Sequence, residues 1–298
     1  MLYLFLTVMI AFVYVLTRLY LLKTEMKSAT RQLQQLNQDK TAKKIGISFH
    51  DRDFEQLAKE INHQIDLTKK AKANKRATEN ELKQAISHIS HDIRTPITSI
   101  MGYIQFLESD EISSELKKEY IQTIKNSTGR LKVLLEDFFE LSIIEQADYP
   151  LKMEKIRFND LVLEALFGFY EEFNKKNIEP SIQIPDEDMI MLLDPSAGKR
   201  VIENLLVNAI KYSSGEVTII LEKFETSIQL KVSNSVHSLS EQEVNQMFDR
   251  FYKADQTRTG DGTGLGLPIA KSLMEKMNGS INAVLKDNQL TMICEWEF

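Results

Sequence analysis

Cysteine is nearly absent from this sequence of 298 residues, in which Cys294 is the single example. One thiol excludes a disulfide framework and a CxxC metal site. Because Cys294 lies in an apolar run near the C-terminus, we expect it to be a small residue of the core. An excess of positive charge is also absent, since the formal net charge is -6. A protein that binds nucleic acid through a basic face is therefore not the default expectation.

The N-terminus lacks the basic region and the small-residue cleavage site of a signal peptide. It carries a long apolar run instead: residues 2–17 are uncharged, and the run resumes after Arg18 and ends at Leu22. At roughly 1.5 Å per residue, this stretch can cross a hydrocarbon core of about 30 Å. Basic residues follow it, so we expect residues 1–22 to form a single transmembrane helix with the remainder of the chain in the cytoplasm. A buried core helix is the alternative.

Proline does not occur between Lys23 and Lys83, and the only glycine in that stretch is Gly46. Apolar residues recur there at helical spacing. Residues 23–78 are therefore predicted to form a signalling connector of two helical segments, joined by a short extended piece at residues 45–49.

Residues 79–147 are predicted to form a helical hairpin with a polar turn at residues 109–114. Isoleucine and leucine recur along both helices at steps of three and four residues. Two helices cannot bury so many apolar side chains between themselves, so we expect the hairpin to pair with a second copy as a four-helix bundle. Residues 151–298 alternate short β-branched runs with helical ones, which predicts an α/β domain.

A first cluster of polar residues lies on the helix predicted to begin after Asp194, which is a suitable N-cap followed by proline. Asn204, Asn208 and Lys211 have the spacing i, i+4, i+7 and share one face of that helix. Two amides and an ammonium group suit a hydrated Mg²⁺ ion and phosphates. Taken alone, the pattern is explained as well by asparagines on an exposed face.

A second cluster is the glycine loop at residues 262–266, in which three glycines alternate with Thr263 and Leu265 before a predicted helix. Backbone N–H groups of such a loop can close on phosphate oxygens at a helix N-terminus. The spacing matches neither GxGxxG nor a Walker A loop, which disfavours a Rossmann or P-loop site. Between the clusters, aromatic residues precede the polar stretch 256–261, and we expect a hinge and a lid there. Placing Phe248 and Phe251 in the core is an equal alternative.

The third cluster contains two histidines, His88 and His91. A neutral imidazole is a good nucleophile near neutral pH. Asp92 can orient the ring of His91 through one nitrogen and accept its proton, and Thr95, one turn further along, could position water against a phosphoryl group. Pro96 removes a helical hydrogen bond and predicts a bend. His88 lacks these neighbours and is predicted to be a bystander.

In their order and spacing, these segments resemble the motifs of bacterial two-component sensor histidine kinases. Residues 90–100 resemble the H box, residues 204–213 the N box, residues 248–255 the F box and residues 262–267 the second glycine box. The resemblance covers residues 79–298. It implies a dimerisation and phosphotransfer hairpin followed by a Bergerat-type ATP-binding α/β sandwich.

The resemblance also implies roles for single residues. Asn208, helped by Asn204, would bind Mg²⁺. The implied nucleotide-binding residues, of which Lys211 and Lys253 would meet the ATP phosphates, are Asn204, Asn208, Lys211, Tyr212, Asn234, Lys253, Gly262, Thr263, Gly264, Leu265 and Gly266. Gyrase-like ATPases of the same superfamily carry a glutamate at the position of Asn204, where it activates water. An amide cannot act as that base, so we expect ATP to be held without rapid hydrolysis.

One stretch departs from the family pattern. The first glycine box usually reads Asp-x-Gly-x-Gly, whereas residues 234–238 read Asn-Ser-Val-His-Ser. Asn234 still offers a carbonyl acceptor for the adenine amino group. The absence of glycine at Val236 and Ser238 puts nucleotide affinity and the shape of the lid in question.

The implied function is autophosphorylation of His91 from Mg-ATP and transfer of the phosphoryl group to an aspartate of a response regulator, with a reverse phosphatase activity catalysed through Thr95. The expected partners are a second copy of the chain, the cognate response regulator and the membrane, with no nucleic acid. The stimulus would be sensed within the membrane, through a membrane partner such as a transporter, or by the connector. A phosphatase-biased or catalytically weak scaffold is the alternative function, and a gyrase-like ATPase is disfavoured by Asn204.

Overall fold

The computed structural model describes residues 1–37, 44–46, 51–108, 112–253 and 262–297, and their side chains except those of residues 36, 37, 77, 81 and 82. The chain divides into two compact units, Met1–Gln84 and Ala85–Phe298.

Two long helices account for most of the first unit. Helix α1 (Leu2–Asn37) is long and apolar enough to cross a membrane, and its apolar window is not buried. It continues without a break past residue 22 into the predicted connector, because neither proline nor glycine interrupts it. Helix α2 (Arg52–Leu107) likewise runs from the connector into the hairpin.

The short segment 44–46 has no regular secondary structure and is held by two side-chain amides. Asn62 accepts from the N–H of Ile45 at 2.8 Å and donates to its carbonyl at 3.0 Å. Gln32 makes the same pair of bonds to Gly46, at 3.0 and 3.2 Å. Only the first part of the predicted extended piece is therefore described as non-helical, since residues 47–50 lie outside the described residues.

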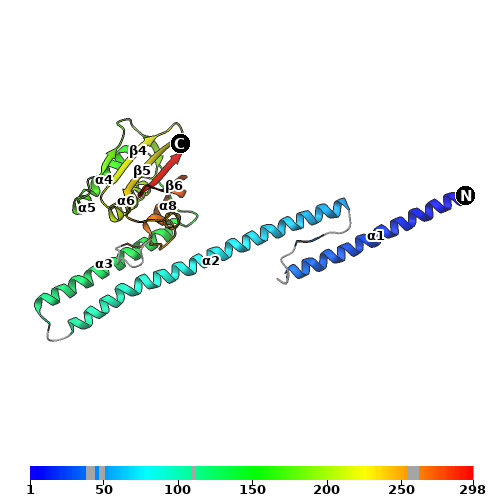
Figure 1. Ribbon diagram of the computed structural model, residues 1–298, viewed down its shortest axis with the longest axis horizontal. Coiled ribbons are helices and arrows are strands. Elements are labelled where there is room, and N and C mark those ends of the chain that lie inside the picture. The colour runs from blue at the N-terminus through cyan, green and yellow to red at the C-terminus, as the bar shows by residue number, and fades with distance from the viewer. Residues whose placement is uncertain (38–43, 47–50, 109–111, 254–261, 298) are drawn as a thin grey trace. The chain divides into compact units, whose positions relative to one another are not determined.

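The second unit begins with the predicted hairpin, in which α2 is followed by α3 (Ser114–Ile144) (Figure 1). Ser127 and Ser99 mark their pairing through a hydroxyl hydrogen bond of 3.3 Å. Ser113 is the N-cap of α3 and accepts from the N–H of Leu116. The turn predicted at residues 109–114 therefore ends earlier than expected, and residues 109–111 lie outside the described part. Helix α2 continues through Pro96.

The remainder of this unit contains two sheets in its described part. Strand β1 (Glu154–Arg157) pairs antiparallel with β3 (Ile190–Leu193). The larger sheet has the order β2-β4-β5-β7-β6; only β2 and β4 are parallel. Its strands are β2 (Ser181–Gln183), β4 (Val217–Lys223), β5 (Ser227–Ser235), β6 (Gly279–Lys286) and β7 (Gln289–Glu297).

Helices complete the predicted α/β sandwich, with α6 packed on β5 and α8 packed on β6. Alternate residues of β7, among them Cys294 and Trp296, are buried, and Phe158 packs edge-on against Trp296 with 4.8 Å between ring centroids. Cys294 is thus a core residue, as expected, and burial raises the pKa of its thiol. The helices are α4 (Phe158–Gly168), α5 (Tyr170–Lys175), α6 (Pro195–Tyr212), α7 (Glu241–Gln246) and α8 (Gly266–Lys276).

The apolar core reaches from the sandwich to the hairpin. Ala85 on α2 and Leu134, Leu141 and Ile144 on α3 are buried in the same cluster as the core of the α/β domain. Helix α3 contacts α8. The hairpin and the glycine loop that precedes α8 are consequently close enough for polar contacts.

Candidate functional site

The helix that carries the first polar cluster, α6, is fixed at its start by Asp194. One carboxylate oxygen accepts from the backbone N–H groups of Ser196 and Ala197 at 2.9 and 3.0 Å, and the other accepts from the N–H of Lys152 at 2.7 Å. This is the N-cap that the sequence predicts. The extra bond to Lys152 ties the start of the α/β domain to α6.

The glycine loop lies against the polar face of α6. A Cβ atom added to Gly266 would lie 3.0 Å from Oδ1 of Asn204, and one added to Gly262 would collide with the ammonium group of Lys211. Lys211 also donates to the hydroxyl of Tyr212 at 2.9 Å. A side chain at Gly266 would press on Asn204, and one at Gly262 would displace the end of Lys211 and strain a backbone with φ +149°. Glycine at both positions thus favours the close approach of loop and helix.

The side chain of Asn204 gives the main indication that a ligand binds beside the glycine loop. The residue is 8% exposed, and its Nδ2 is buried without a hydrogen-bond partner. Such a group costs about 1–3 kcal/mol unless a ligand or water oxygen bonds to it. In the described part of the chain, no group of three or more His, Cys, Asp or Glu side chains could hold a metal. A Mg²⁺ ion would therefore depend on the amide oxygens of Asn204 and Asn208 together with phosphate oxygens, and these residues fit Mg-ATP.

The glycine loop is also tied to the aromatic segment before it. Gly264 has φ +70°, and its carbonyl accepts from the N–H of Phe251 at 3.0 Å. Phe251 is buried and Phe248 packs against the core, which supports the core interpretation of both residues. The predicted lid at residues 256–261 lies outside the described residues.

Asn234 lies on β5 between Val217 of β4 and Leu290 of β7. It is 1% exposed, and its Nδ2 is 3.3 Å from the carbonyl of Ser235. The N–H of Val236 donates to the carbonyl of Asn288 at 2.8 Å. The segment 234–238, which replaces the first glycine box, is thus held at its central residue, Val236, by a backbone hydrogen bond.

His91 lies on α2 with a side chain that is 76% exposed. Its Nδ1 is 3.2 Å from one oxygen of Asp92, and the other oxygen accepts from the ammonium group of Lys253 at 2.6 Å. Burial raises the pKa of Asp92, but the bonds from Lys253 and His91 lower it more, so the pKa lies below its ordinary value. Thr95 donates its hydroxyl proton to the carbonyl of His91 at 3.2 Å.

Comparison with known families matches two parts of the chain. Residues 81–147 match the His Kinase A (phospho-acceptor) domain, and residues 193–294 match the histidine kinase-, DNA gyrase B- and HSP90-like ATPase family. The chain belongs to the two-component sensor histidine kinases. It is a protein histidine kinase with an ATP-binding domain.

Two relatives of this histidine kinase are similar to it over most of its length. Sensor histidine kinase YcbM of Bacillus subtilis is 28% identical over 265 residues, which are 87% of this chain and 85% of YcbM. Sensor protein VanSC of Enterococcus gallinarum is 28% identical over 282 residues, 93% of this chain and 76% of VanSC.

Solved structures agree with the fold. Histidine kinase ThkA, in complex with the response regulator protein TrrA, is 25% identical with a TM-score of 0.63, over 77% of this chain and 66% of ThkA. Histidine kinase AdeS of Acinetobacter baumannii has a TM-score of 0.56 at 22% identity, over 70% of this chain and 97% of AdeS.

In this kinase, the described structure brings the predicted site residues into two groups. Asn204, Lys211, Tyr212 and the glycine loop lie together, and His91, Asp92 and Thr95 lie on α2. Lys253 connects the groups, since the ammonium predicted to meet ATP phosphates is bonded to Asp92. The role of Lys253 in binding phosphate thus stays a prediction.

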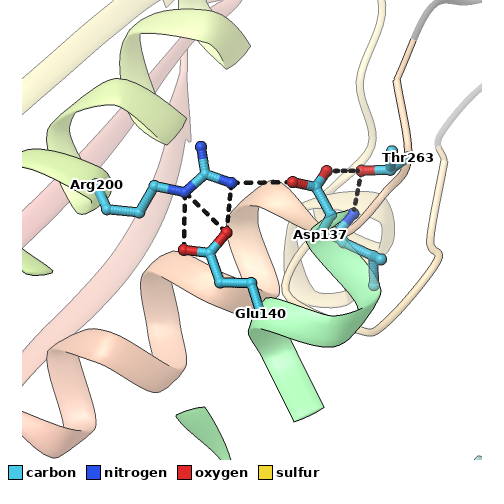
Figure 2. Close-up of polar contacts among 5 residues, drawn as sticks. Asp137, Glu140, Arg200 and Thr263 are labelled. Carbon is cyan, nitrogen blue, oxygen red and sulfur yellow. Dashed lines mark hydrogen bonds and ion pairs between the residues drawn. The ribbon is translucent and has the colours of Figure 1, made fainter. Parts of the chain in front are cut away.

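Sequence reasoning missed a second connection, which Figure 2 shows. Arg200 on α6 is bonded to Glu140 and Asp137 of α3, and Asp137 also accepts from the hydroxyl of Thr263 at 2.6 Å. Asp137 and Glu140 are three residues apart and share one face of α3. That spacing is visible in the sequence, but nothing in the sequence pairs it with Arg200.

Proposed function

We propose that this kinase autophosphorylates His91 from Mg-ATP and passes the phosphoryl group to an aspartate of a cognate response regulator. The observation that carries the proposal is the anchored and exposed imidazole. Asp92 holds Nδ1 of His91, and Lys253, from the ATP-binding domain, holds Asp92. The complex of ThkA with TrrA supports a response regulator as the partner.

The proposed chemistry uses the free ring nitrogen. With Nδ1–H donating to Asp92, Nε2 carries the lone pair and attacks the γ-phosphorus while the bond to the bridging oxygen of ADP breaks. The imidazolium then passes its Nδ1 proton to water by way of Asp92. Because the pKa of Asp92 lies below its ordinary value, the carboxylate stays ionised. Asp92 therefore orients the imidazole ring and stabilises its positive charge, and it does not keep the proton. Bound Mg²⁺ would neutralise phosphate charge.

Incubation of the full chain with γ-labelled ATP and Mg²⁺ tests this proposal. We expect an acid-labile label on the wild-type chain and none on His91→Gln. His88→Gln is the matched control, because His88 lies on the same helix one turn earlier, and it should be labelled like wild type. Label that persists on His91→Gln would show that another residue is the acceptor.

A phosphatase activity towards the phosphorylated regulator forms part of the proposal. Thr95 shares a helical face with His91, but its hydroxyl group donates a hydrogen bond to the backbone carbonyl of His91. Its oxygen can still accept a hydrogen bond from water. Thr95→Ala should therefore slow dephosphorylation of the regulator while His91 is still labelled; an unchanged rate would exclude this role.

A phosphatase-biased or catalytically weak scaffold is the second candidate. It is favoured by Val236 and Ser238 at the positions of the two glycines and by the buried amide of Asn234. Calorimetric titration with Mg-ATP separates the candidates. Tight binding together with robust labelling of His91 would exclude the scaffold.

The active form is proposed to be a homodimer that pairs through the hairpin. Large apolar side chains of α2 and α3 are 40% to 60% exposed in the single chain, among them Ile97, Met101, Phe106, Phe139 and Ile143. A helical hairpin that exposes such residues is stabilised by pairing with a second copy. Light scattering of the full chain in detergent should give the mass of two chains, after correction for the detergent.

Helix α1 is proposed to anchor the kinase as a single-pass membrane protein with its catalytic part in the cytoplasm. Its apolar, unburied window supports this assignment. Sensing through the membrane segment, alone or with a partner such as a transporter, remains a prediction. Replacing residues 2–22 by an unrelated anchor should abolish the response to stimulus, and a full response would argue for sensing by the connector.

A further inference from the structure

Two residues predicted to bind the nucleotide, Lys253 and Thr263, are bonded to carboxylates of the hairpin. The ammonium of Lys253 is bonded to Asp92 of α2 at 2.6 Å. The hydroxyl of Thr263, in the glycine loop, donates to Asp137 of α3 at 2.6 Å. A hydroxyl has one proton, so Thr263 cannot donate to a phosphate oxygen while it donates to Asp137.

Asp137 is held in this position by Arg200. Nη2 of Arg200 lies 2.9 Å from Oδ1 of Asp137 and 2.6 Å from Oε2 of Glu140, and Nε lies 3.0 Å from both oxygens of Glu140 (Figure 2). Burial lowers the pKa of Arg200, but its bonds to Glu140 and Asp137 raise it more, so that the pKa lies above its ordinary value. The side chain of Asp137 is 13% exposed, and solvent screens these contacts only in part.

The same contact joins both sides of the candidate nucleotide site. Arg200 lies one turn before Asn204 on α6, and Thr263 lies between two glycines of the loop. Thr263 also accepts from the N–H of Leu265, at 3.2 Å. A single carboxylate of the hairpin therefore fixes the loop and α6 at once.

A carboxylate at this place acts against a polyphosphate ligand. It competes for the donor of Thr263, and its negative charge opposes the approach of another anion. Release of Asp137 would have to precede or accompany phosphate binding. By reciprocity, a bound nucleotide would weaken the contact between hairpin and ATP-binding domain by the same factor.

We propose that Asp137, oriented by Arg200 and Glu140, is an internal competitor of the nucleotide phosphates and lowers the affinity of this kinase for ATP until the hairpin releases the glycine loop. The proposal rests on the nucleotide site described above. It assigns to α3 a direct effect on ATP binding. A change in α3 that moved Asp137 would thereby open the site.

Calorimetric titration of the full chain with Mg²⁺ and a non-hydrolysable ATP analogue tests the proposal. Asp137→Ala removes the competitor, and Arg200→Gln removes the group that orients it. Each variant should bind the analogue about threefold to tenfold more tightly, because a larger fraction of molecules is competent to bind. Each should also label His91 faster at ATP concentrations below saturation.

Glu136→Gln is the matched control. Glu136 also lies on α3 but pairs with Lys132 of its own helix and, among the described residues, makes no hydrogen bond or ion pair with Arg200 or the glycine loop. This variant therefore removes one carboxylate without touching the contact. Its affinity should equal that of wild type. Unchanged or weaker binding in Arg200→Gln would overturn the proposal, and so would a gain of equal size in Glu136→Gln.

A pair of charge reversals keeps the test decisive if Asp137→Ala fails to fold. Arg200→Glu should tighten binding, and adding Glu140→Arg, which restores an opposite charge beside position 200, should move the affinity back towards wild type. If the variants bind the ATP analogue with the expected affinities but no chain, wild type included, is labelled on His91, the proposed kinase function is refuted and the role of Asp137 as a competitor stands. Normal labelling with unchanged affinities would refute the competitor alone.

Discussion

Replacing Asp194 by alanine should lower the free energy of unfolding of the ATP-binding domain by about 2–4 kcal/mol. Loss of an N-cap costs about 0.5–2 kcal/mol. The N–H of Lys152 also donates to the carboxylate over 2.7 Å, and loss of this bond to a charged acceptor costs about 1.5–3 kcal/mol more. The cost lies towards the lower figure, because Lys152 is exposed and water can replace the carboxylate. The variant removes both, since one side chain makes both contacts.

Trp296 provides the assay. It is the only tryptophan in the sequence, and it is 2% exposed in the core of the ATP-binding domain. Its fluorescence in a urea titration therefore reports on the unfolding of that domain alone. The midpoint should shift to lower urea with an unchanged slope if only stability changes.

Two further variants show whether the loss has the stated cause. Asp194→Asn should lose about half as much, because its amide oxygen can still cap α6 while its nitrogen cannot accept from Lys152. Asp148→Ala changes an exposed carboxylate four positions before Lys152 in the sequence and should leave the midpoint unchanged. A loss below about 1 kcal/mol for Asp194→Ala, or equal losses for both Asp194 variants, would refute the reasoning.

Two other predictions concern the site itself. Gly264→Ala should weaken binding of a Mg-bound ATP analogue by about tenfold or more, because φ of +70° costs an L-residue about 1–2 kcal/mol and the new Cβ would lie 3.0 Å from the backbone of Phe251. Gly168→Ala is the control, because a Cβ there meets open space. Wild-type affinity of Gly264→Ala in calorimetry would contradict the prediction. Lys253→Met should raise the pKa of Asp92, measured by a carbon NMR titration of its carboxyl group. In the wild type, the lowered pKa of Asp92 stabilises the fold at pH values above the ordinary pKa of aspartate, and this stabilisation is lost as the pH falls through the lowered pKa. Lys253→Met should therefore be less stable than wild type at neutral pH and equally stable at strongly acidic pH. An unchanged pKa in Lys253→Met would show that the contact does not persist in solution.

The sequence was most informative where function requires local geometry. The N-cap of α6 and the spacing of Asn204, Asn208 and Lys211 follow from helical periodicity, and the glycine loop follows from residue order alone. The long strands β4, β5 and β7 follow from their β-branched runs. Strands β1, β2, β3 and β6 were missed; in β1 and β2 most side chains are exposed and give no apolar alternation.

By itself, the sequence determined the kind of protein: an apolar helix at the N-terminus, a helical hairpin with His91, and an α/β sandwich with a nucleotide site. The tertiary structure alone decided which charges meet. Lys253 is 161 residues from Asp92, and Thr263 is 126 residues from Asp137. Local spacing specifies the face of a helix on which a charge lies, whereas its partner depends on how the apolar core packs the domains together.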